Sequence, residues 1–154
     1  MATNKNIANE VIHNLWLGDA KASQSREFIK AKNINCIINC TVTSEFLPGK
    51  LFRYKYRIPV KDNCEPEEIS LMYSILDKTA DIIYRHLQNG DVILVHCHAG
   101  RQRSVSIILA FIMKYACMSF NKSLILLKTK RSVSCYPDIN FHSALLSYEK
   151  HLRS

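Results

Sequence analysis

The sequence lacks the features that would carry a chain into or across a membrane. Its 154 residues contain no run of about 18 apolar residues, the length that a membrane-spanning helix requires. Residues 1–5 do not form the apolar core of a secretory signal peptide. Internal repeats, low-complexity tracts and linkers are absent as well. We therefore expect a single globular domain over residues 1–154 that works in a reducing compartment, the cytoplasm or the nucleus.

Paired metal-ligand motifs are also absent. His96, Cys97 and His98 are adjacent, but no Cys-x2-Cys or His-x3-His pair completes a set of four zinc ligands. The lysine of a nucleotide-binding GxxxxGK[ST] loop is missing too. We expect neither a metal nor a cofactor. The six cysteines (36, 40, 64, 97, 117 and 135) are expected to be buried reduced thiols, because a chain of this size builds a hydrophobic core without disulfide bonds.

Acidic side chains are scarce relative to basic ones. The 13 Asp and Glu residues against 21 Lys and Arg residues give a formal charge of +8, which favours a negatively charged partner. Residues 52–58 alternate apolar and cationic side chains, a period of two that predicts a strand with one buried and one basic face. The cations of the basic face are Arg53, Lys55 and Arg57. Either this face is simply solvated or it docks an acidic partner such as a phosphoprotein or an anionic lipid. Nucleic acid is not favoured, because Tyr54 and Tyr56 fall on the buried face.

The most informative stretch is a short loop between two apolar runs. The run at 91–95 is short and β-branched, which is typical of a buried strand, and the run at 105–113 is long enough for a helix. Backbone N–H groups of such a loop converge with the helix N-terminus into an anion site whose dipole favours the Cys97 thiolate. Arg103 can hold two oxygens of one phosphate with its planar fork. Gly100 supplies backbone freedom where a side chain would obstruct the anion.

The loop carries a recognisable motif. His96-Cys97-x-x-Gly100-x-x-Arg103-Ser104 resembles the HCxxGxxRS signature of cysteine-dependent phosphatases, and Ala99 and Ser104 match the dual-specificity branch. The resemblance covers nearly the whole chain, including an upstream segment that ends in Leu-x-Leu-Gly. It implies a small, atypical dual-specificity phosphatase, which hydrolyses phosphotyrosine and phosphoserine or phosphothreonine in proteins through a cysteinyl-phosphate.

The resemblance also implies a role for each site residue. Cys97 is the nucleophile, and Asp62 is the general acid, in a segment similar to the family's I-P-V-x-D. Spacing alone does not choose Asp62 over nearby glutamates, and a cap or turn role for it stays open. Ser104 either caps the following helix or hydrogen-bonds the Cys97 sulfur. His96 orients the loop. Phosphate is held by the loop residues His98, Ala99, Gly100, Arg101, Gln102 and Arg103.

The remaining patterns alternate between strands and helices. Strands are expected in an opening hairpin that ends at Gly18 and at 34–40, 52–58 and 91–95. Helices are expected at 25–32, from 66 to a stop at 89–90, and at 104–117, 121–131 and 141–152. The apolar stripe of the second helix comprises Ile69, Met72, Tyr73, Leu76, Ala80, Ile83 and Leu87. We expect an α/β domain with a central, mostly parallel sheet flanked by helices, and the resemblance implies the protein-tyrosine-phosphatase-like fold.

The substrate is less well defined than the reaction. A protein substrate is favoured. His98 and Arg101 are basic and Gln102 replaces the usual Ser or Gly, which is similar to relatives that act on phosphoinositides or phosphatidylglycerophosphate, so a lipid phosphatase is the alternative. An RNA 5′-phosphatase and a non-catalytic phosphate-binding module rank lower. Cys40 or Cys64 is a candidate for a reversible disulfide with Cys97. The sequence does not indicate an oligomeric state.

Overall fold

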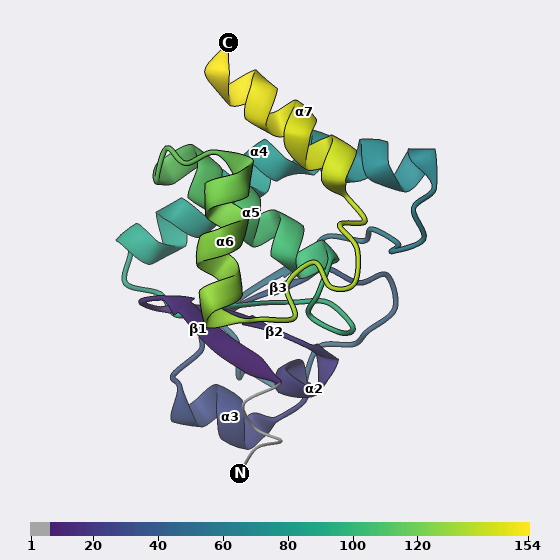
Figure 1. The fold of residues 1–154 in the computed structure, drawn as a ribbon. Helices are drawn as coiled ribbons and strands as arrows, with labels where there is room; N and C mark the ends of the chain where they lie inside the picture. Colours follow the sequence, from purple (N-terminus) through teal and green to yellow (C-terminus); the bar gives the residue numbers. More distant parts are fainter. Residues whose placement is uncertain (1–6) are drawn as a thin grey trace.

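The protein is built on one five-stranded sheet (Figure 1). The computed structural model describes residues 7–154, so the segment at 1–5 that bears on a signal peptide lies outside the described residues. The strands are β1 (Ala8–Ile12), β2 (Leu15–Gly18), β3 (Cys36–Asn39), β4 (Tyr54–Arg57) and β5 (Ile93–His96). Their order is β1-β2-β5-β3-β4, and only β1 runs antiparallel to its neighbour. The prediction of an α/β domain with a mostly parallel sheet is confirmed.

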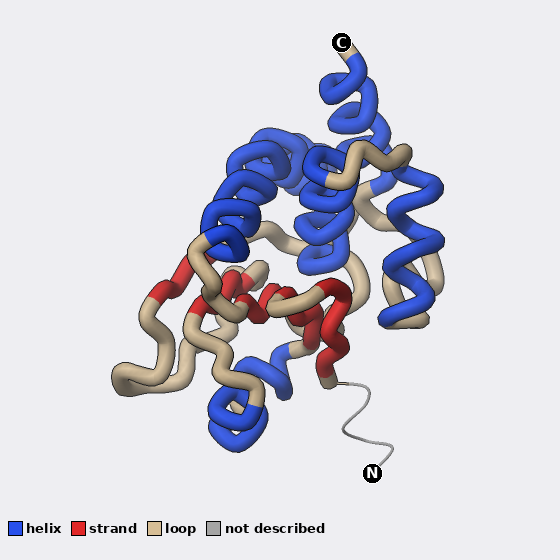
Figure 2. Tube along the Cα trace, turned by 90° about the vertical axis from the view of Figure 1, so that its left-hand side faces the viewer, coloured by secondary structure: helices blue, strands red, loops and turns tan. Residues whose placement is uncertain are grey.

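Helices cover both faces of the sheet, as Figure 2 shows from the side. The short helices α2 (Ala20–Ser23) and α3 (Arg26–Ala31) lie on one face; α4 (Pro66–Gln88), α5 (Arg103–Tyr115), α6 (Phe120–Lys130) and α7 (His142–Arg153) lie on the other. Successive strand residues alternate between the two layers. Ile37 packs in the smaller apolar cluster with α2 and α3, whereas Ile38 packs in the larger one with α4 to α7.

Local sequence explains where most of these helices begin. Ser25 caps α3 by accepting a hydrogen bond from the Phe28 N–H at 3.1 Å, and Pro66 starts α4 at a position where its missing N–H costs nothing. The stripe of α4 is buried at Met72 and its helical neighbours, but Tyr73 is 39% exposed. Its place in the predicted stripe was wrong, because consecutive helical residues are about 100° apart and Met72 already occupies the buried face.

The basic strand is shorter than predicted but keeps its alternation. β4 is an edge strand in which Lys55 and Arg57 are exposed while the tyrosines between them are half-buried. The guanidinium of Arg57 lies 5.0 Å from the Phe46 ring and donates hydrogen bonds to the Thr41 and Ser44 carbonyls at 3.0 and 2.8 Å. Arg57 therefore braces the loop that follows β3, at the carboxyl end of the sheet.

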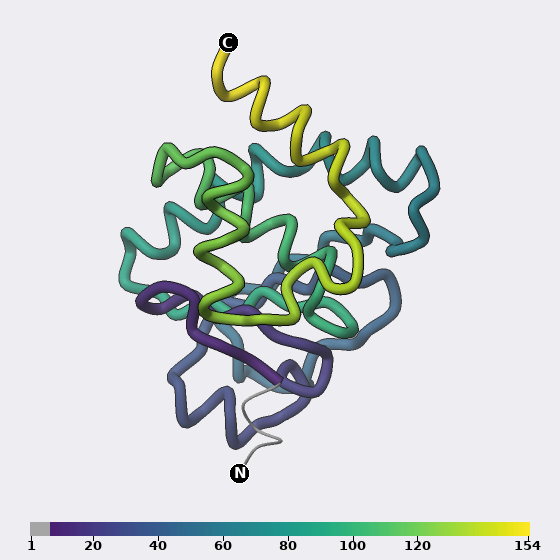
Figure 3. Tube along the Cα trace, in the orientation of Figure 1, coloured from purple at the N-terminus to yellow at the C-terminus, as the bar shows by residue number. Residues whose placement is uncertain are grey.

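The parallel strands bring the chemically important loops to one edge. The carboxyl ends of β3 and β5 are side by side, with Asn39 opposite His96. The chain then returns to this edge after α6, as the trace in Figure 3 shows, and Cys135 N–H donates to the Arg101 carbonyl at 2.7 Å. Within residues 7–154 no helix has the length and apolar character needed to cross a bilayer.

Candidate active site

The loop between β5 and α5 has a conformation that only glycine fits at its centre. Gly100 has φ +67°, which glycine adopts without the steric cost that other residues incur. A Cβ at this position would lie 2.6 Å from the Gly18 carbonyl oxygen and 2.7 Å from an Arg131 nitrogen. The loop is thus pressed against β2 on one side and against a buried arginine on the other.

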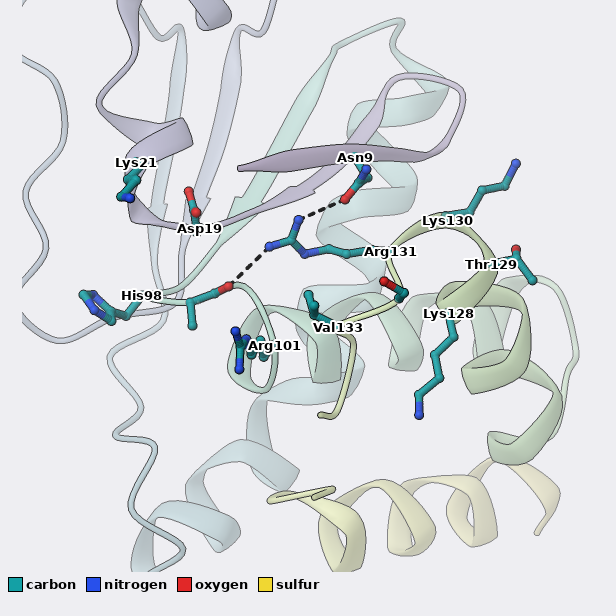
Figure 4. Close-up of a pocket in the computed structure, with 12 residues that line it drawn as sticks. Asn9, Asp19, Lys21, His98, Arg101, Lys128, Thr129, Lys130, Arg131 and Val133 are labelled. Atoms are coloured by element: carbon teal, nitrogen blue, oxygen red, sulfur yellow. Dashed lines mark hydrogen bonds between the residues drawn. The ribbon is translucent and has the colours of Figure 1, made fainter. Parts of the chain in front are cut away.

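Arg131 holds the loop from outside the site. It is only 3% exposed, and it donates to the Gly100 carbonyl at 2.9 Å and to the Ala99 carbonyl at 3.3 Å (Figure 4). A further hydrogen bond of 2.9 Å reaches Asn9 Oδ1 on β1. Because Arg131 donates hydrogen bonds to both of these carbonyls, the orientation of the two peptide groups is fixed. The sequence analysis placed Arg131 only at the end of a helix, and one arginine among three lysines gives no signal of this role.

Cys97 lies at the base of the site beside a serine. Its side chain is 2% exposed, and its Sγ is 3.1 Å from Ser104 Oγ. Ser104 lies inside α5, whose N-cap is Gln102 without a side-chain capping bond, so of the two roles considered for Ser104 the structure shows the contact with the sulfur and not the cap. The hydroxyl instead meets the sulfur, where it can donate to a thiolate.

His96 is fully buried next to Cys97. Its Nδ1–H donates to the Cys97 carbonyl at 3.1 Å, while Nε2 has no hydrogen-bond partner among the described residues. Burial lowers the pKa of His96 to about 4, and the nearby Arg57 and Arg103 charges add to the effect. The ring is therefore neutral at physiological pH, and its role in orienting the loop stays a prediction.

Arg103 is half-buried at the first turn of α5. Its Nη1 donates to the Val60 carbonyl at 3.0 Å, which ties α5 to the segment that carries Asp62. Its Nε is buried and has no partner among the described residues. A buried donor without a partner is costly, so this nitrogen is suited to an incoming anion.

Asp62 and Arg103 line one pocket of about 530 Å³ together with His98. The other lining residues are Thr41, Val42, Thr43, Ser44, Lys61 and Asn63. Asp62 Oδ1 accepts a hydrogen bond of 2.9 Å from Asn140 Nδ2. Glu68, one of the alternatives that spacing left open, accepts from the Lys61 N–H at 2.8 Å and does not line this pocket.

Gln102 links the phosphate loop to the same asparagine. Its Oε1 accepts from the Asn140 N–H at 3.0 Å, and its Nε2 donates to the Asp138 carbonyl at 2.6 Å. The side chain is buried and turned toward residues 136–140, so only its backbone remains for the predicted phosphate binding. Asn140, which the sequence analysis did not single out, thereby connects Asp62 with the phosphate loop.

The other loop cations are outside the catalytic pocket or at its rim. His98 and Arg101 are exposed; His98 lines the catalytic pocket, whereas Arg101 lines a neighbouring one. The side chain of Arg101 therefore faces the neighbouring pocket, and its place among the phosphate-binding residues stays a prediction. No group of three His, Cys, Asp or Glu side chains with metal-ligand geometry occurs within residues 7–154.

The cysteines divide by environment. Cys36, Cys40 and Cys135 are buried like Cys97, but Cys64 and Cys117 are exposed, so the expectation of buried thiols fails for these two. Burial raises the pKa of Cys36 to about 12 and that of Cys135 to about 11. Burial also raises the pKa of Cys40, whose N–H donates to the His96 carbonyl at 2.8 Å. Cys40 thus lies beside Cys97 across β3 and β5, and their pairing under peroxide stays a prediction.

Comparison with known sequences places this arrangement in a family. The model described as "Dual specificity phosphatase, catalytic domain" matches residues 15–151. Human Dual specificity protein phosphatase 16 is 32% identical over 148 residues, which are 94% of this chain and 21% of the human protein. Dual specificity protein phosphatase 1B of Arabidopsis thaliana is 30% identical, covering 94% of this chain and 83% of that protein. Putative tyrosine phosphatase 123R of Invertebrate iridescent virus 6 is 32% identical, covering 94% of each.

Solved structures show the same fold. The crystal structure of human DUSP28 superposes with a TM-score of 0.82 at 24% sequence identity, covering 96% of this chain and 95% of that one. DUSP15 superposes with a TM-score of 0.81 at 25% identity, covering 96% and 94%. The chain spans about a fifth of human phosphatase 16 (21%) but most of the plant and viral proteins.

Proposed function

Because this chain belongs to the dual specificity phosphatase catalytic domain family, we propose that it hydrolyses phosphotyrosine and phosphoserine or phosphothreonine in proteins. The observation that carries the proposal is that Asp62 shares a pocket with two residues of the loop that begins at Cys97, His98 and Arg103. Cys97 Sγ lies 3.1 Å from the Ser104 hydroxyl, and Asp62 lines one pocket with Arg103. A nucleophile, a phosphate-binding guanidinium and a proton donor are the groups that this reaction requires.

The first step transfers the phosphoryl group to the enzyme. The Cys97 thiolate donates its electron pair to phosphorus, and the bond from phosphorus to the substrate oxygen breaks. Arg103 and the amides of residues 98–103 hold the non-bridging oxygens, whose charge increases in the transition state. Asp62 gives its proton to the departing oxygen. The hydrogen bond from Asn140 keeps its carboxyl at the pocket wall for this transfer.

The second step releases inorganic phosphate. Asp62, now a carboxylate, takes a proton from a water molecule that attacks phosphorus, and the sulfur–phosphorus bond breaks. The Ser104 hydroxyl donates to the departing thiolate and stabilises its charge. The neutral His96 ring takes no part in proton transfer but fixes the Cys97 carbonyl.

We also propose a cellular compartment and a surface for an acidic partner. A thiolate nucleophile needs a reducing compartment to avoid oxidation, which supports the cytoplasm or the nucleus. Of the basic β4 face, Arg57 is already engaged with Phe46 and the following loop. Arg53 lies over the Tyr54 ring at 5.4 Å and Lys55 over the Phe46 ring at 5.9 Å, so these two cations are offered to an acidic partner from the aromatic surface of the strand.

The function is tested by phosphate release without added metal. Matched panels of phosphotyrosine peptides, phosphothreonine peptides and short-chain phosphorylated lipids are compared, with Cys97→Ser as the blank. We expect turnover of both peptide classes in preference to the lipids. A preference for the lipids would overturn the protein assignment, and turnover that persists in Cys97→Ser would overturn the mechanism.

A further inference from the structure

The loop that follows β3 forms one wall of the catalytic pocket, and residues 41–44 all line it. Arg57 on β4 does not line this pocket, yet its guanidinium makes three hydrogen bonds to the loop. Nη1 donates to the Thr41 and Val42 carbonyls at 3.0 and 3.2 Å, and Nη2 donates to the Ser44 carbonyl at 2.8 Å. These loop carbonyls are therefore turned toward the Arg57 side chain, and their orientation depends on it.

The two ends of this loop have a second support, the fully buried side chain of Asn39. Its Nδ2 donates to the Ser44 carbonyl at 2.8 Å, and its Oδ1 accepts from the Thr41 N–H at 3.0 Å. Thr41 Oγ1 in turn accepts from the Ser44 N–H at 3.0 Å. Asn39 therefore holds the ends of the loop, whereas the carbonyls of Thr41 and Val42 are held by Arg57.

The N–H groups in the middle of the loop are free. In a trans peptide group the carbonyl and the N–H point in opposite directions. Because Arg57 takes the carbonyls of the two preceding peptide groups, the N–H groups of Val42 and Thr43 point away from it. Within residues 7–154 neither N–H has a hydrogen-bond acceptor, whereas those of Thr41 and Ser44 do. Val42 and Thr43 are exposed and line the catalytic pocket, so two free donors lie where a substrate enters.

We propose that the N–H groups of Val42 and Thr43 bind a main-chain carbonyl of the peptide substrate, and that Arg57 is the positioning residue that aims them. The proposal rests on the proposed function and adds how the substrate main chain is recognised. The target side chain enters the pocket toward Cys97, so the residues that flank it cross the exposed loop. An extended peptide presents a carbonyl about every 3.3 Å, whatever its side chains are. The contact therefore serves phosphotyrosine and phosphothreonine peptides alike.

The contact is tested from the substrate side with phosphotyrosine peptides in which a trans alkene replaces one amide group near the target residue. The alkene keeps the extended shape and removes the carbonyl, whereas an ester at the same position keeps a carbonyl and removes only the N–H. We expect one alkene peptide to have a KM about 3- to 10-fold above that of the parent peptide, the range of one neutral hydrogen bond. Its ester twin should stay close to the parent. If no alkene raises KM, the proposal is overturned.

Arg57→Met tests the positioning role from the protein side. It should raise the KM of the parent peptide about as much as the alkene does and change kcat little. A small aryl phosphate, which has no peptide main chain, should be affected far less. The alkene and parent peptides should then have equal KM values, because the contact is already lost. Arg57→Lys should restore part of the effect, since an ammonium can still donate to these carbonyls. Arg26→Met is the matched control, because Arg26 donates to the Pro48 carbonyl of the same connection, outside the pocket.

Binding without turnover separates this proposal from the proposed function. The parent peptide is titrated into nitrogen-15-labelled Cys97→Ser, and the amide resonances of Val42 and Thr43 are followed by NMR. Shifts that appear with the parent peptide and vanish with the critical alkene peptide support the contact even if the wild type does not turn the peptide over. Equal shifts with inorganic phosphate alone would assign both N–H groups to the phosphate and overturn the proposal. Equal losses of Arg57→Met on peptide and aryl phosphate would overturn the role of Arg57, and both results leave the phosphatase assignment standing.

Discussion

Buried polar side chains at the two ends of the sheet differ in whether they have hydrogen-bond partners within the protein. At the amino end, the Tyr56 hydroxyl donates to His86 Nε2 at 2.6 Å, and His86 Nδ1–H donates to Asp91 Oδ2 at 2.7 Å. Asp91 Oδ1 in turn accepts from Asn35 Nδ2 at 2.9 Å, and Asn35 Oδ1 accepts from the Val92 N–H. Each of these side-chain groups has a partner within the protein.

At the carboxyl end, two buried nitrogens are left open. His96 Nε2 and Arg103 Nε have no partner among the described residues, and both lie around Cys97. A complete network stabilises the fold, whereas the incomplete one leaves the Arg103 Nε–H as a donor for a ligand and Nε2 of the neutral His96 ring as an acceptor. The difference teaches that this protein separates the task of holding the sheet together from the task of binding phosphate.

The largest test of this separation is removal of the nucleophile. Cys97→Ser should lower kcat by about four orders of magnitude or more, because the thiolate has no substitute. Stability should hardly change, since the serine keeps its neighbour Ser104. Phosphate release and urea denaturation measure the two effects. Residual turnover near the wild-type rate would place the nucleophile elsewhere.

The next largest effect is expected at the proton donor. Asp62→Asn should slow hydrolysis of a phosphopeptide with a poor leaving group about 100-fold, a typical size for lost acid catalysis. An activated aryl phosphate should be slowed far less, because its leaving group needs no proton. Glu67→Gln, which makes the same charge change in the first turn of α4, is the control. Equal losses on both substrates would make Asp62 a structural residue.

Arg131 supports both the stability of the fold and the shape of the loop, so its replacement should lower both stability and activity. Arg131→Met leaves the Ala99 and Gly100 carbonyls without their donor, and we expect a loss of about 2–4 kcal/mol in the free energy of unfolding. The loop should then sample other conformations, with kcat/KM about tenfold lower. Lys130→Met is the control at the next position. A stable variant with full activity would show that the loop holds its shape unaided.

At the amino end, stability should change without activity. His86→Phe leaves Tyr56 and Asp91 without their partner and should cost about 2 kcal/mol, while Tyr56→Phe removes one hydrogen bond and should cost about 1 kcal/mol. Both variants should keep the wild-type kcat/KM below their unfolding transitions. A loss of activity in a folded variant would show that the network at the amino end also supports catalysis, which would contradict the proposed separation.

A graded response to acid also distinguishes the two ends of the sheet. The pKa of His96 is lowered to about 4, so the unfolded chain takes up this proton first as pH falls below about 6.5. Stability should fall between pH 6.5 and 4 by at most about 1.4 kcal/mol per pH unit. Burial raises the pKa of Asp91, but hydrogen bonds from His86, Asn35 and Asn89 outweigh burial and lower it, so its contribution is lost only as pH falls below about 4.

The midpoint of urea unfolding, measured at each pH from above 6.5 to below 4, gives the change in stability. The NMR resonances of the imidazole rings show which histidine takes up the proton. A His96 resonance that titrates near pH 6.5 would contradict the burial argument. Asp91→Asn should reduce the loss of stability below pH 4 and leave the upper phase in place; Asp77 and Asp81, whose pKa values are also lowered by hydrogen bonds, account for the rest.

The sequence predicts those parts of the fold that depend on residues close together in the chain. The strand-loop-helix around Cys97 follows from a β-branched run, a glycine and a long apolar run, and α4 follows from Pro66 and its apolar spacing. Ser104 was ambiguous because capping and sulfur contact need the same hydroxyl, and only the helix boundary separates them. The buried place of Arg131 depends on how α6 docks on β1, which no local pattern encodes. Asn140 likewise meets Asp62 across 78 positions of sequence.

The hydrogen bond between Arg131 and Asn9 has a further consequence for how the protein is made. It joins positions 122 residues apart, so the loop obtains its last support only after the C-terminal third of the chain has docked on the first strand. Contacts between residues this distant in sequence form slowly, because a long stretch of chain must lose conformational entropy before the contact stabilises it. We therefore expect turnover to recover after dilution from denaturant no faster than this long-range contact forms.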